Sequence, residues 1–270
     1  MRRSLAVLGA GAAVAAPLAL SPDPARAAAP PAALTKIACR STVDPARRAV
    51  SVVSIMRHRP GTRSLAVRFT LLQKVPGGVL TPVRDGDLGH WTRPTDATLG
   101  RLPADVWKLR KTVFNVDAPA VYRFRVSFRW TGRNGKVLAR QTLGTSSCAV
   151  RELRPDLVVR SVTVRPTGLA PGNDRYVADV ANRGRTASGP FGVEFAPGAS
   201  GGPTQTVAVA SLAPGAHARV RFIGRACDPA APPTVIADPA QAVDDFDRSN
   251  NALTVSCPTA TPSDLVRSGL

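Results

Sequence analysis

The sequence predicts an all-β protein: two tandem β-sandwich domains that follow a signal peptide. Helical periodicity is almost absent along the 270 residues. Short runs of alternating apolar and polar residues, separated by Gly, Pro and Asn, take its place. The apolar content of 44% is enough for a globular core, so a wholly disordered chain is excluded. About 240 residues remain after the leader, which is enough for two domains of ordinary size.

The N-terminal segment, residues 1–29, has the three-part layout of a secretory signal peptide. A basic start at Met1–Arg3 precedes the uncharged apolar run Leu5–Leu20, and cleavage is expected after Ala27 or Ala29. An uncleaved membrane anchor is the alternative, but a run of about 16 residues is short for a span that needs about 20. We therefore expect a mature chain without a transmembrane segment, which is either freely secreted into the extracellular space or held non-covalently at the cell surface.

Alternation marks the strands of a first domain, residues 30–152. In the run V-Y-R-F-R-V-S-F-R-W at Val121–Trp130, the aromatic and apolar side chains occupy one face and the arginines occupy the other. Asn134-Gly135 then predicts a hairpin turn, with Val137–Thr142 as the return strand. Two further strands are expected upstream, at Val50–Met56 and Leu65–Leu71.

A second domain, residues 153–257, begins at a short charged and Pro-bearing joint. It contains seven short runs typical of strands, at the spacing of an immunoglobulin-like sandwich. These runs are Leu157–Val164, Tyr176–Ala181, Phe191–Phe195, Thr204–Val209, Ala218–Ile223, Thr234–Ala237 and Leu253–Val255. We expect both domains to be immunoglobulin-like sandwiches, and residues 258–270 to form a flexible tail.

Four cysteines, an even number behind a signal peptide, indicate disulfides. Three pairings are open, and free buried thiols are the alternative. Order along the chain favours Cys39–Cys148 and Cys227–Cys257, because each bridge then lies within one domain. The first bridge would join the opening strand of its domain to the last strand.

Positive charge is concentrated in the first domain. The whole chain has 36 Lys and Arg against 18 Asp and Glu, a net charge of +18. Residues 30–152 contain 22 basic and 7 acidic side chains, a difference of +15, whereas residues 153–257 contain 10 and 9, a difference of +1. A codon bias toward Arg would act on both halves alike, so it does not explain the asymmetry.

The strand pattern gives this charge a geometry. Arg123, Arg125 and Arg129 project from one face of a single strand, and alternate residues lie about 7 Å apart. Arg68 and Arg140 on other strands are expected to join them. Guanidinium groups bind phosphate or sulfate oxygens through two parallel hydrogen bonds. These five residues are therefore the candidate polyanion-binding site, and a solvated face that only keeps the protein soluble is the alternative.

The expected ligand of this site is an anionic polymer of the cell envelope, and a surface protein is the other expected partner. Nucleic acid is not expected as the dedicated ligand, because the chain is exported and the arginines lack an exposed aromatic platform.

Five short motifs follow one another along the second domain. They are Pro155-Asp156-Leu157, V-A-N-R-G at Val180–Gly184, L-A-P-G at Leu212–Gly215, A-D-P at Ala237–Pro239 and V-D-D-F-D-R-S-N-N at Val243–Asn251. In order and spacing this region, about residues 155–257, resembles the CARDB domain, the cell adhesion related domain found in bacteria. The resemblance implies an immunoglobulin-like module of exported and surface proteins that supplies no catalytic residues. Asp244 and Asp245 stand where that family tends to carry Glu. The first domain shows no such resemblance.

The candidate catalytic and metal motifs each lack a necessary part. Gly198–Gly202 matches G-x-S-x-G, but prolines bracket it and no helix pattern follows, so it does not fit a nucleophile elbow. Asp85, Asp87 and His90 would need a distant fourth ligand to hold a metal ion. We expect no catalytic residue and no cofactor.

Asp244, Asp245 and Asp247 are weak candidates for a calcium site, since Ca²⁺ prefers oxygen ligands. A calcium loop that starts at Asp245 would lack the Gly at its sixth position and the Glu at its twelfth. Asp and Asn are also common turn residues, and we favour a structural turn.

These observations predict an exported, non-enzymatic binding or adhesion protein of the bacterial cell surface or extracellular space. Its Arg-rich sheet face would capture envelope polyanions. The alternatives are a carbohydrate-binding accessory module that uses Trp91 or Trp107, a secreted hydrolase with an unrecognised site, and a structural envelope component with no soluble ligand.

Overall fold

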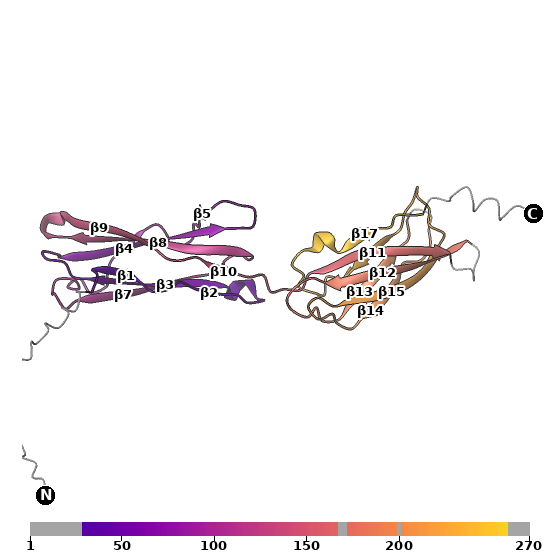
Figure 1. Cartoon of the computed structure of the whole chain (residues 1–270), viewed down its shortest axis with the longest axis horizontal. Helices are drawn as coiled ribbons and strands as arrows, with labels where there is room; N and C mark the ends of the chain where they lie inside the picture. The colour runs from indigo at the N-terminus through magenta and orange to yellow at the C-terminus, as the bar shows by residue number, and fades with distance from the viewer. Residues whose placement is uncertain (1–28, 167–171, 199–200, 259–270) are drawn as a thin grey trace, which may run out of the picture. The chain divides into compact units, whose positions relative to one another are not determined.

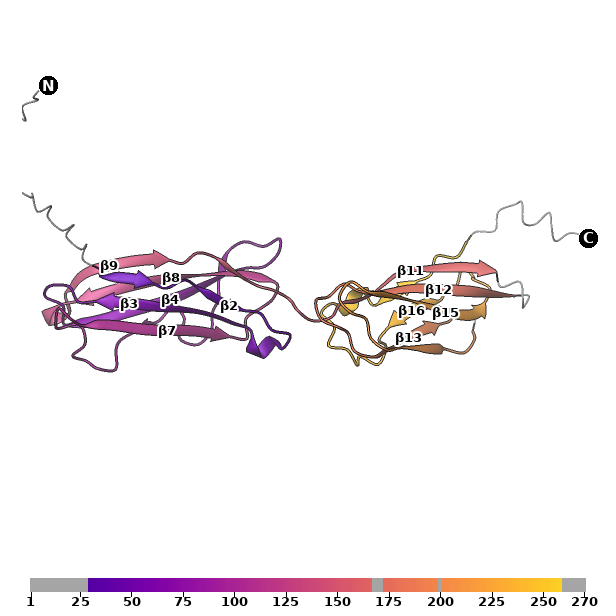
Figure 2. The ribbon, with the colours of Figure 1, turned by 60° about the horizontal axis from the view of Figure 1, so that its bottom comes forward.

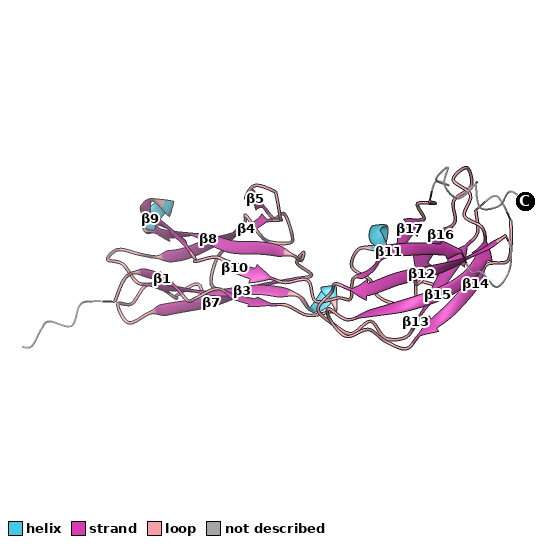
Figure 3. Cartoon of the chain, turned by 45° about the vertical axis from the view of Figure 1, so that its right-hand side comes forward, coloured by secondary structure: helices cyan, strands magenta, loops and turns pink. Residues whose placement is uncertain are grey.

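In the computed structural model, the regular secondary structure is almost entirely β-strand, and loops connect the strands (Figure 3). It describes residues 29–166, 172–198 and 201–258. Within these ranges the only helical segments are three 3-10 turns, at Pro45–Arg47, Arg133–Gly135 and Arg248–Asn250. The all-β prediction is confirmed. The predicted leader up to residue 28 and the predicted tail from residue 259 lie outside the described residues, as does Ser200 of the G-x-S-x-G motif.

The first ten strands form two facing antiparallel sheets, which we call the first sandwich (Figure 1). In one sheet β3 pairs with β1, β2 and β7. In the other, the long pair β4 and β8 is flanked by β5, β6, β9 and β10. The strands are β1 (Ala32–Leu34), β2 (Ala38–Arg40), β3 (Ala49–Arg57), β4 (Ser64–Lys74), β5 (Thr81–Pro82), β6 (Trp91–Thr92), β7 (Val106–Phe114), β8 (Ala120–Thr131), β9 (Val137–Gly144) and β10 (Cys148–Val150).

Strand β8 shows why these residues form a sandwich. Every second side chain, from Tyr122 to Trp130, is at most 1% exposed and packs into the core between the sheets. The hairpin predicted at Asn134-Gly135 is present. Both residues have positive φ, 56° and 72°, a backbone conformation that Asn and Gly adopt more readily than other residues.

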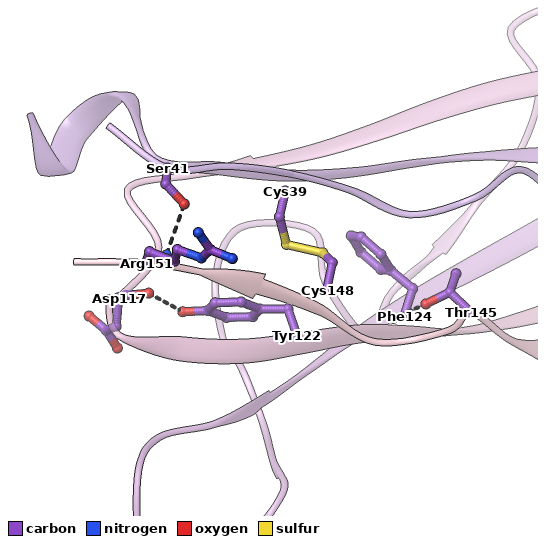
Figure 4. Close-up of a disulfide and its surroundings, with 8 residues drawn as sticks. All are labelled: Cys39, Ser41, Asp117, Tyr122, Phe124, Thr145, Cys148 and Arg151. Atoms are coloured by element: carbon purple, nitrogen blue, oxygen red, sulfur yellow. Dashed lines mark hydrogen bonds between the residues drawn. A yellow bond between two sulfur atoms is a disulfide. The ribbon is translucent and has the colours of Figure 1, made fainter. Parts of the chain in front are cut away.

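The Cys39–Cys148 disulfide connects the two sheets of the first sandwich, because Cys39 lies in β2 and Cys148 in β10 (Figure 4). Close to the bridge, the Tyr122 hydroxyl donates a hydrogen bond of 2.8 Å to the Asp117 carbonyl. Cys227 pairs with Cys257. Both predicted pairings are confirmed.

The remaining seven strands form a second sandwich around a separate core (Figure 2). One sheet has the order β11-β12-β15 and the other β14-β13-β16-β17. The strands are β11 (Leu157–Pro166), β12 (Asn173–Asn182), β13 (Phe191–Ala196), β14 (Gln205–Val209), β15 (His217–Arg225), β16 (Thr234–Ala237) and β17 (Ala252–Thr254). Each of the seven predicted runs corresponds to one of them.

A single buried amide holds several loops of the second sandwich. Asn182, which is 0% exposed, donates hydrogen bonds to the carbonyls of Thr186 and Leu212 at 2.8 and 2.9 Å. Its side-chain oxygen accepts hydrogen bonds from the N–H groups of Asp156 and Gly184 at 3.1 and 2.9 Å. All four bonding positions of the amide are therefore used. The Asn of the V-A-N-R-G motif thereby fixes the start of β11, the turn after β12 and the loop before β15.

The two hydrophobic cores share no residue. The division into domains at residues 30–152 and 153–257 remains a prediction, and unfolding measurements test it together with the disulfides.

Replacing both Cys39 and Cys148 by Ala is expected to lower the free energy of unfolding by about 5 kcal/mol, because the bridge closes a loop with a sequence separation of 109. Chemical unfolding followed by circular dichroism should show the loss in one of two transitions.

The matched control for this measurement is the pair Cys227→Ala and Cys257→Ala. Its separation of 30 predicts a smaller loss of about 3.5 kcal/mol, confined to the other transition. A single transition that moves as a whole in both variants would contradict two independent domains.

The buried side-chain amide of Asn182 yields another prediction. Asn182→Ala leaves the Thr186 carbonyl and the N–H groups of Asp156 and Gly184 without their partner, whereas the Leu212 carbonyl keeps its bond to the Ser188 N–H. Each such unpaired buried group costs about 1–3 kcal/mol. We expect a loss of at least about 3 kcal/mol in urea unfolding. Thr206→Ala, on the exposed face of β14, serves as the control and should change stability by less than about 0.5 kcal/mol. An equal, small effect of the two substitutions would show that water replaces the amide.

Candidate anion-binding face

The strand register brings the predicted arginines to the outer face of the β4-β8-β9 sheet. Arg129 of β8 lies directly opposite Arg140 of β9, and Arg68 of β4 lies directly opposite Ser127 of β8. Directly opposite residues in an antiparallel pair project from the same face. Since Arg129 and Ser127 are two residues apart on β8, both pairs share one face.

Arg123 and Arg125 continue this face along β8, and Arg125 lies opposite Thr70 of β4. We call this surface the β8 arginine face. Its members are Arg68, Arg123, Arg125, Arg129 and Arg140. Arg123, Arg125 and Arg140 are exposed, whereas Arg68 and Arg129 are half-buried.

Protein carboxylates do not neutralise this face. Among the residues that the structure describes, no acidic side chain forms an ion pair with any of the five arginines. Arg129 and Arg140 stand directly opposite each other on neighbouring strands, a placement of like charges that does not favour strand pairing.

Trp91 in β6 lies on the same face, directly opposite Arg68. The guanidinium carbon of Arg129 is 4.3 Å from the centre of the Trp91 ring, and that of Arg68 is 5.0 Å away. Such cation–π contacts hold the two side chains in place before any ligand binds. This contact was not predicted from the sequence, and Trp91, which is half-buried beneath the two guanidinium groups, is not an exposed aromatic platform. A strand of two residues shows no alternation from which this position could be read.

Trp91 and Trp107 do not line one sugar-binding groove. Trp107 belongs to β7 in the other sheet of the first sandwich, is 9% exposed and contributes to the core. Trp91 is stacked against two guanidinium groups. The carbohydrate-binding alternative therefore loses the pair of rings that suggested it.

In the loop that contains Asp85, Asp87 and His90, one of the three candidate ligands is already paired with a cation. Asp87 forms an ion pair with Lys111 of β7, whose hydrogen bond and charge lower the pKa of the Asp87 carboxyl. In the described ranges, no three His, Cys, Asp or Glu side chains are placed to hold a metal ion.

The acidic segment near Asp245 forms a structural turn. The Asp245 carboxylate is 5% exposed and accepts hydrogen bonds from the Leu157 N–H at 3.0 Å, the Asn251 amide at 3.1 Å and the Asp247 N–H at 3.0 Å. Burial raises the pKa of Asp245, and these hydrogen bonds oppose that shift. Asp247 caps the following 3-10 turn through the Ser249 N–H. Their oxygens are thus occupied by the protein itself.

Asp244 and His217, the histidine that follows the G-x-S-x-G motif in the sequence, also have partners within the protein. Asp244 pairs with Arg154 at 3.4 Å. Nδ1 of His217 lies 2.9 Å from a carboxylate oxygen of Asp179, on the exposed face of β12 and β15. Ser200 of the G-x-S-x-G motif lies outside the described residues. The alternative of a secreted hydrolase, with an unrecognised site in the first domain, is a separate one that the structure does not test.

Residues 154–255 match the CARDB family model, which confirms the resemblance of the C-terminal region. The match covers less than half of the chain and indicates a cell-adhesion-related, non-enzymatic role. No curated protein matches the chain.

Two solved structures illustrate the similarity at the level of structure. One is a complex of the exo-chitosanase CsxA of Amycolatopsis orientalis with PNP-β-D-glucosamine, with a TM-score of 0.25, 15% identity, and coverage of 82% of this chain and 26% of the enzyme chain. The other is the class 5 fimbriae chaperone CfaA, with a TM-score of 0.25, 10% identity, and coverage of 83% and 100%. The chain thus spans about a quarter of the chitosanase length. At this TM-score neither similarity supports a functional conclusion.

The two disulfides and the CARDB match fit an extracellular protein. Among the described residues, no helix has the length and apolar character needed to cross a membrane.

The stacking of Arg129 on Trp91 yields a spectroscopic prediction. Trp107 and Trp130 are buried, so acrylamide quenching of the accessible fluorescence reports mainly on Trp91. Arg129→Ala should increase the quenching constant, because it uncovers part of the Trp91 ring. Arg125→Ala, on the same strand and face but without a contact to Trp91, should leave it unchanged. Equal quenching in both variants would mean that the stack does not form in solution.

Proposed function

We propose that the protein is an exported, non-enzymatic binding protein that captures an anionic polymer of the cell envelope on the β8 arginine face. The observation that carries this proposal is the absence of ion pairs, within the described residues, for five arginines that share one sheet face. Each guanidinium group can offer two parallel hydrogen bonds to a phosphate or sulfate group.

The contacts with Trp91 add to this argument. A ligand that meets a freely moving Arg side chain must first restrict it, at an estimated 0.5–1.5 kcal/mol for each side chain. Arg68 and Arg129 are already positioned by the Trp91 ring, so part of this cost is met during folding. The exposed Arg123, Arg125 and Arg140 then extend the charged surface on which a long polymer can lie.

Secretion and surface association belong to the same proposal. The predicted signal peptide, the two disulfides and the adhesion-related CARDB match all support a site of action outside the cell. In this arrangement the first sandwich binds the polymer, and the CARDB region spaces it from a partner or contacts that partner.

Salt dependence of binding tests the proposal. We would titrate the mature chain with teichoic acid, heparin, DNA and a neutral glucan between about 50 and 300 mM salt, where counterion release makes log K fall linearly with log salt. The triple variant Arg123→Gln, Arg125→Gln, Arg140→Gln should weaken polyanion binding at least tenfold at low salt. For this variant, the slope of log K against log salt should become shallower by about 0.7–0.9 for each phosphate group that is no longer bound.

The charge-matched control is the triple variant Arg63→Gln, Arg101→Gln, Arg133→Gln. All three residues are exposed, and they lie outside the β8 arginine face. Less than a twofold change is expected. If this control weakens binding as much as the face variant does, attraction is generic and the face is not a site. Salt-insensitive binding of the glucan would favour the carbohydrate-binding alternative.

A further inference from the structure

The second sandwich has a basic surface, although the net charge of residues 153–257 is only +1. On the outer face of the β11-β12-β15 sheet, Arg165 of β11 lies directly opposite Arg175 of β12. On the other side of β12, Arg219 and Arg221 of β15 lie opposite Asp179 and Val177. Since these positions differ by two or four residues along each strand, the four arginines share one face.

This face is hollowed into a groove of about 690 Å³, which we call the β12 groove. Ser161 and Thr163 of β11 and Val177 of β12, three short side chains, line it together with the long arginines. Short residues in the middle of a sheet face with long ones around them leave a depression. The two hydroxyl groups also provide hydrogen-bond donors between the guanidinium groups.

The β12 groove carries an excess of positive charge. Its one acidic lining residue, Asp179, is hydrogen-bonded to His217 at 2.9 Å. Across the described ranges, none of the four arginines forms an ion pair with an acidic side chain. Arg165 and Arg175 form a direct cross-strand pair of like charges, which destabilises the sheet unless an anion lies between them.

The acidic residues that balance the charge of this region are used elsewhere. Asp245 and Asp238 are buried and accept hydrogen bonds from backbone N–H groups, including Leu157 and Val243. Asp174 accepts a hydrogen bond from the Cys227 N–H. These carboxylates are bonded to backbone N–H groups outside the groove, so a sum of charges near zero for the whole region is compatible with a basic groove.

We propose that the β12 groove is a second anion-binding site, which binds a segment of a polymer that carries phosphate or sulfate groups. Arg219 and Arg221 are two residues apart, about 7 Å along β15, and the Arg165–Arg175 pair lies across the groove on β11 and β12. One tetrahedral oxyanion is too small to contact both pairs of arginines, whereas successive groups of one polymer chain can do so. A flat membrane surface fits a concave site less well than a single chain does.

This inference does not rest on the proposed function, because the β12 groove and the β8 arginine face share no residue and no strand. The experiment uses the full mature chain, in which Arg123→Gln, Arg125→Gln and Arg140→Gln have removed exposed charges of the first face. The probes are inorganic polyphosphate and heparin, titrated by calorimetry between about 50 and 300 mM salt. Polyphosphate tests a phosphate ligand, and heparin a sulfated one.

In this background, Arg175→Gln with Arg221→Gln should weaken binding of the better probe at least tenfold. The salt slope should decrease by about 0.7–0.9 for each anionic group that is no longer bound. The pair Arg165→Gln with Arg219→Gln should act in the same direction, which guards against a folding defect in one variant. The control pair Arg183→Gln with Arg185→Gln removes the same charge from the loop after β12 and should change binding less than twofold.

The inference is overturned if the groove pairs bind as the control pair does, or if the background chain binds neither probe. It is also overturned if vesicles of anionic phosphatidylglycerol bind better than both polymers and respond to the groove variants. Failure of the proposed function would give a different result. The triple variant of the β8 arginine face would then bind as well as the unmodified chain, and groove substitutions made in the unmodified chain would abolish binding. That result would leave the β12 groove as the polymer site.

Discussion

The strict alternation of strand β8 is the constraint on which the first sandwich depends. Side chains at every second position are buried between the sheets, and burying one such aromatic or aliphatic side chain contributes about 1.5–3 kcal/mol. The intervening positions must then face outward, whatever their charge. A shift of the register by one residue would place arginines in the core and aromatic rings in water. The basic face is therefore held in place by the same pattern that makes the core.

The second sandwich depends on polar anchors as well as on its core. Asn182 and Asp245 are nearly inaccessible to solvent, and both bind backbone groups from segments far apart in the sequence. Their partners meet at the start of β11, where the N–H groups of Asp156 and Leu157 are bonded to these two side chains. This explains why the most recognisable motifs of the region lie in turns. The polar residues there are structural, and the exposed strand faces remain free to vary in charge.

Much of the fold could be predicted from the sequence wherever alternation is long and regular. Strands β4 and β8 and the strands of the second sandwich follow this rule. The two disulfides could be predicted on another basis, the order of the cysteines along the chain. Strand β7 was not predicted, because Lys111 occupies a core-facing position opposite Val52 and interrupts the alternation. Its ammonium group pairs with Asp87, a contact that connects distant parts of the chain. The very short strands, among them β6 with Trp91, contain too few residues to show a period.

The two candidate sites differ in what a sequence can reveal of them. The β8 arginine face could be predicted because three of its members stand in one strand with a period of two, and because a count of charges singles out its domain. The β12 groove combines residues from three strands, and a sum of charges conceals it, because several compensating carboxylates, among them Asp238 and Asp245, lie in turns away from the groove. Both surfaces place two arginines directly opposite each other.

An exposed pair of this kind costs only a fraction of the free energy that one buried aromatic side chain contributes, about 0.2–1 kcal/mol against 1.5–3 kcal/mol. The fold can therefore tolerate it. At the Arg165–Arg175 pair, an anion bound between the two side chains would gain both its own hydrogen bonds and the relief of repulsion between the guanidinium groups. Like-charged cross-strand pairs on an otherwise stable sandwich thus favour the bound state over the free one, which is what a surface that captures anions requires.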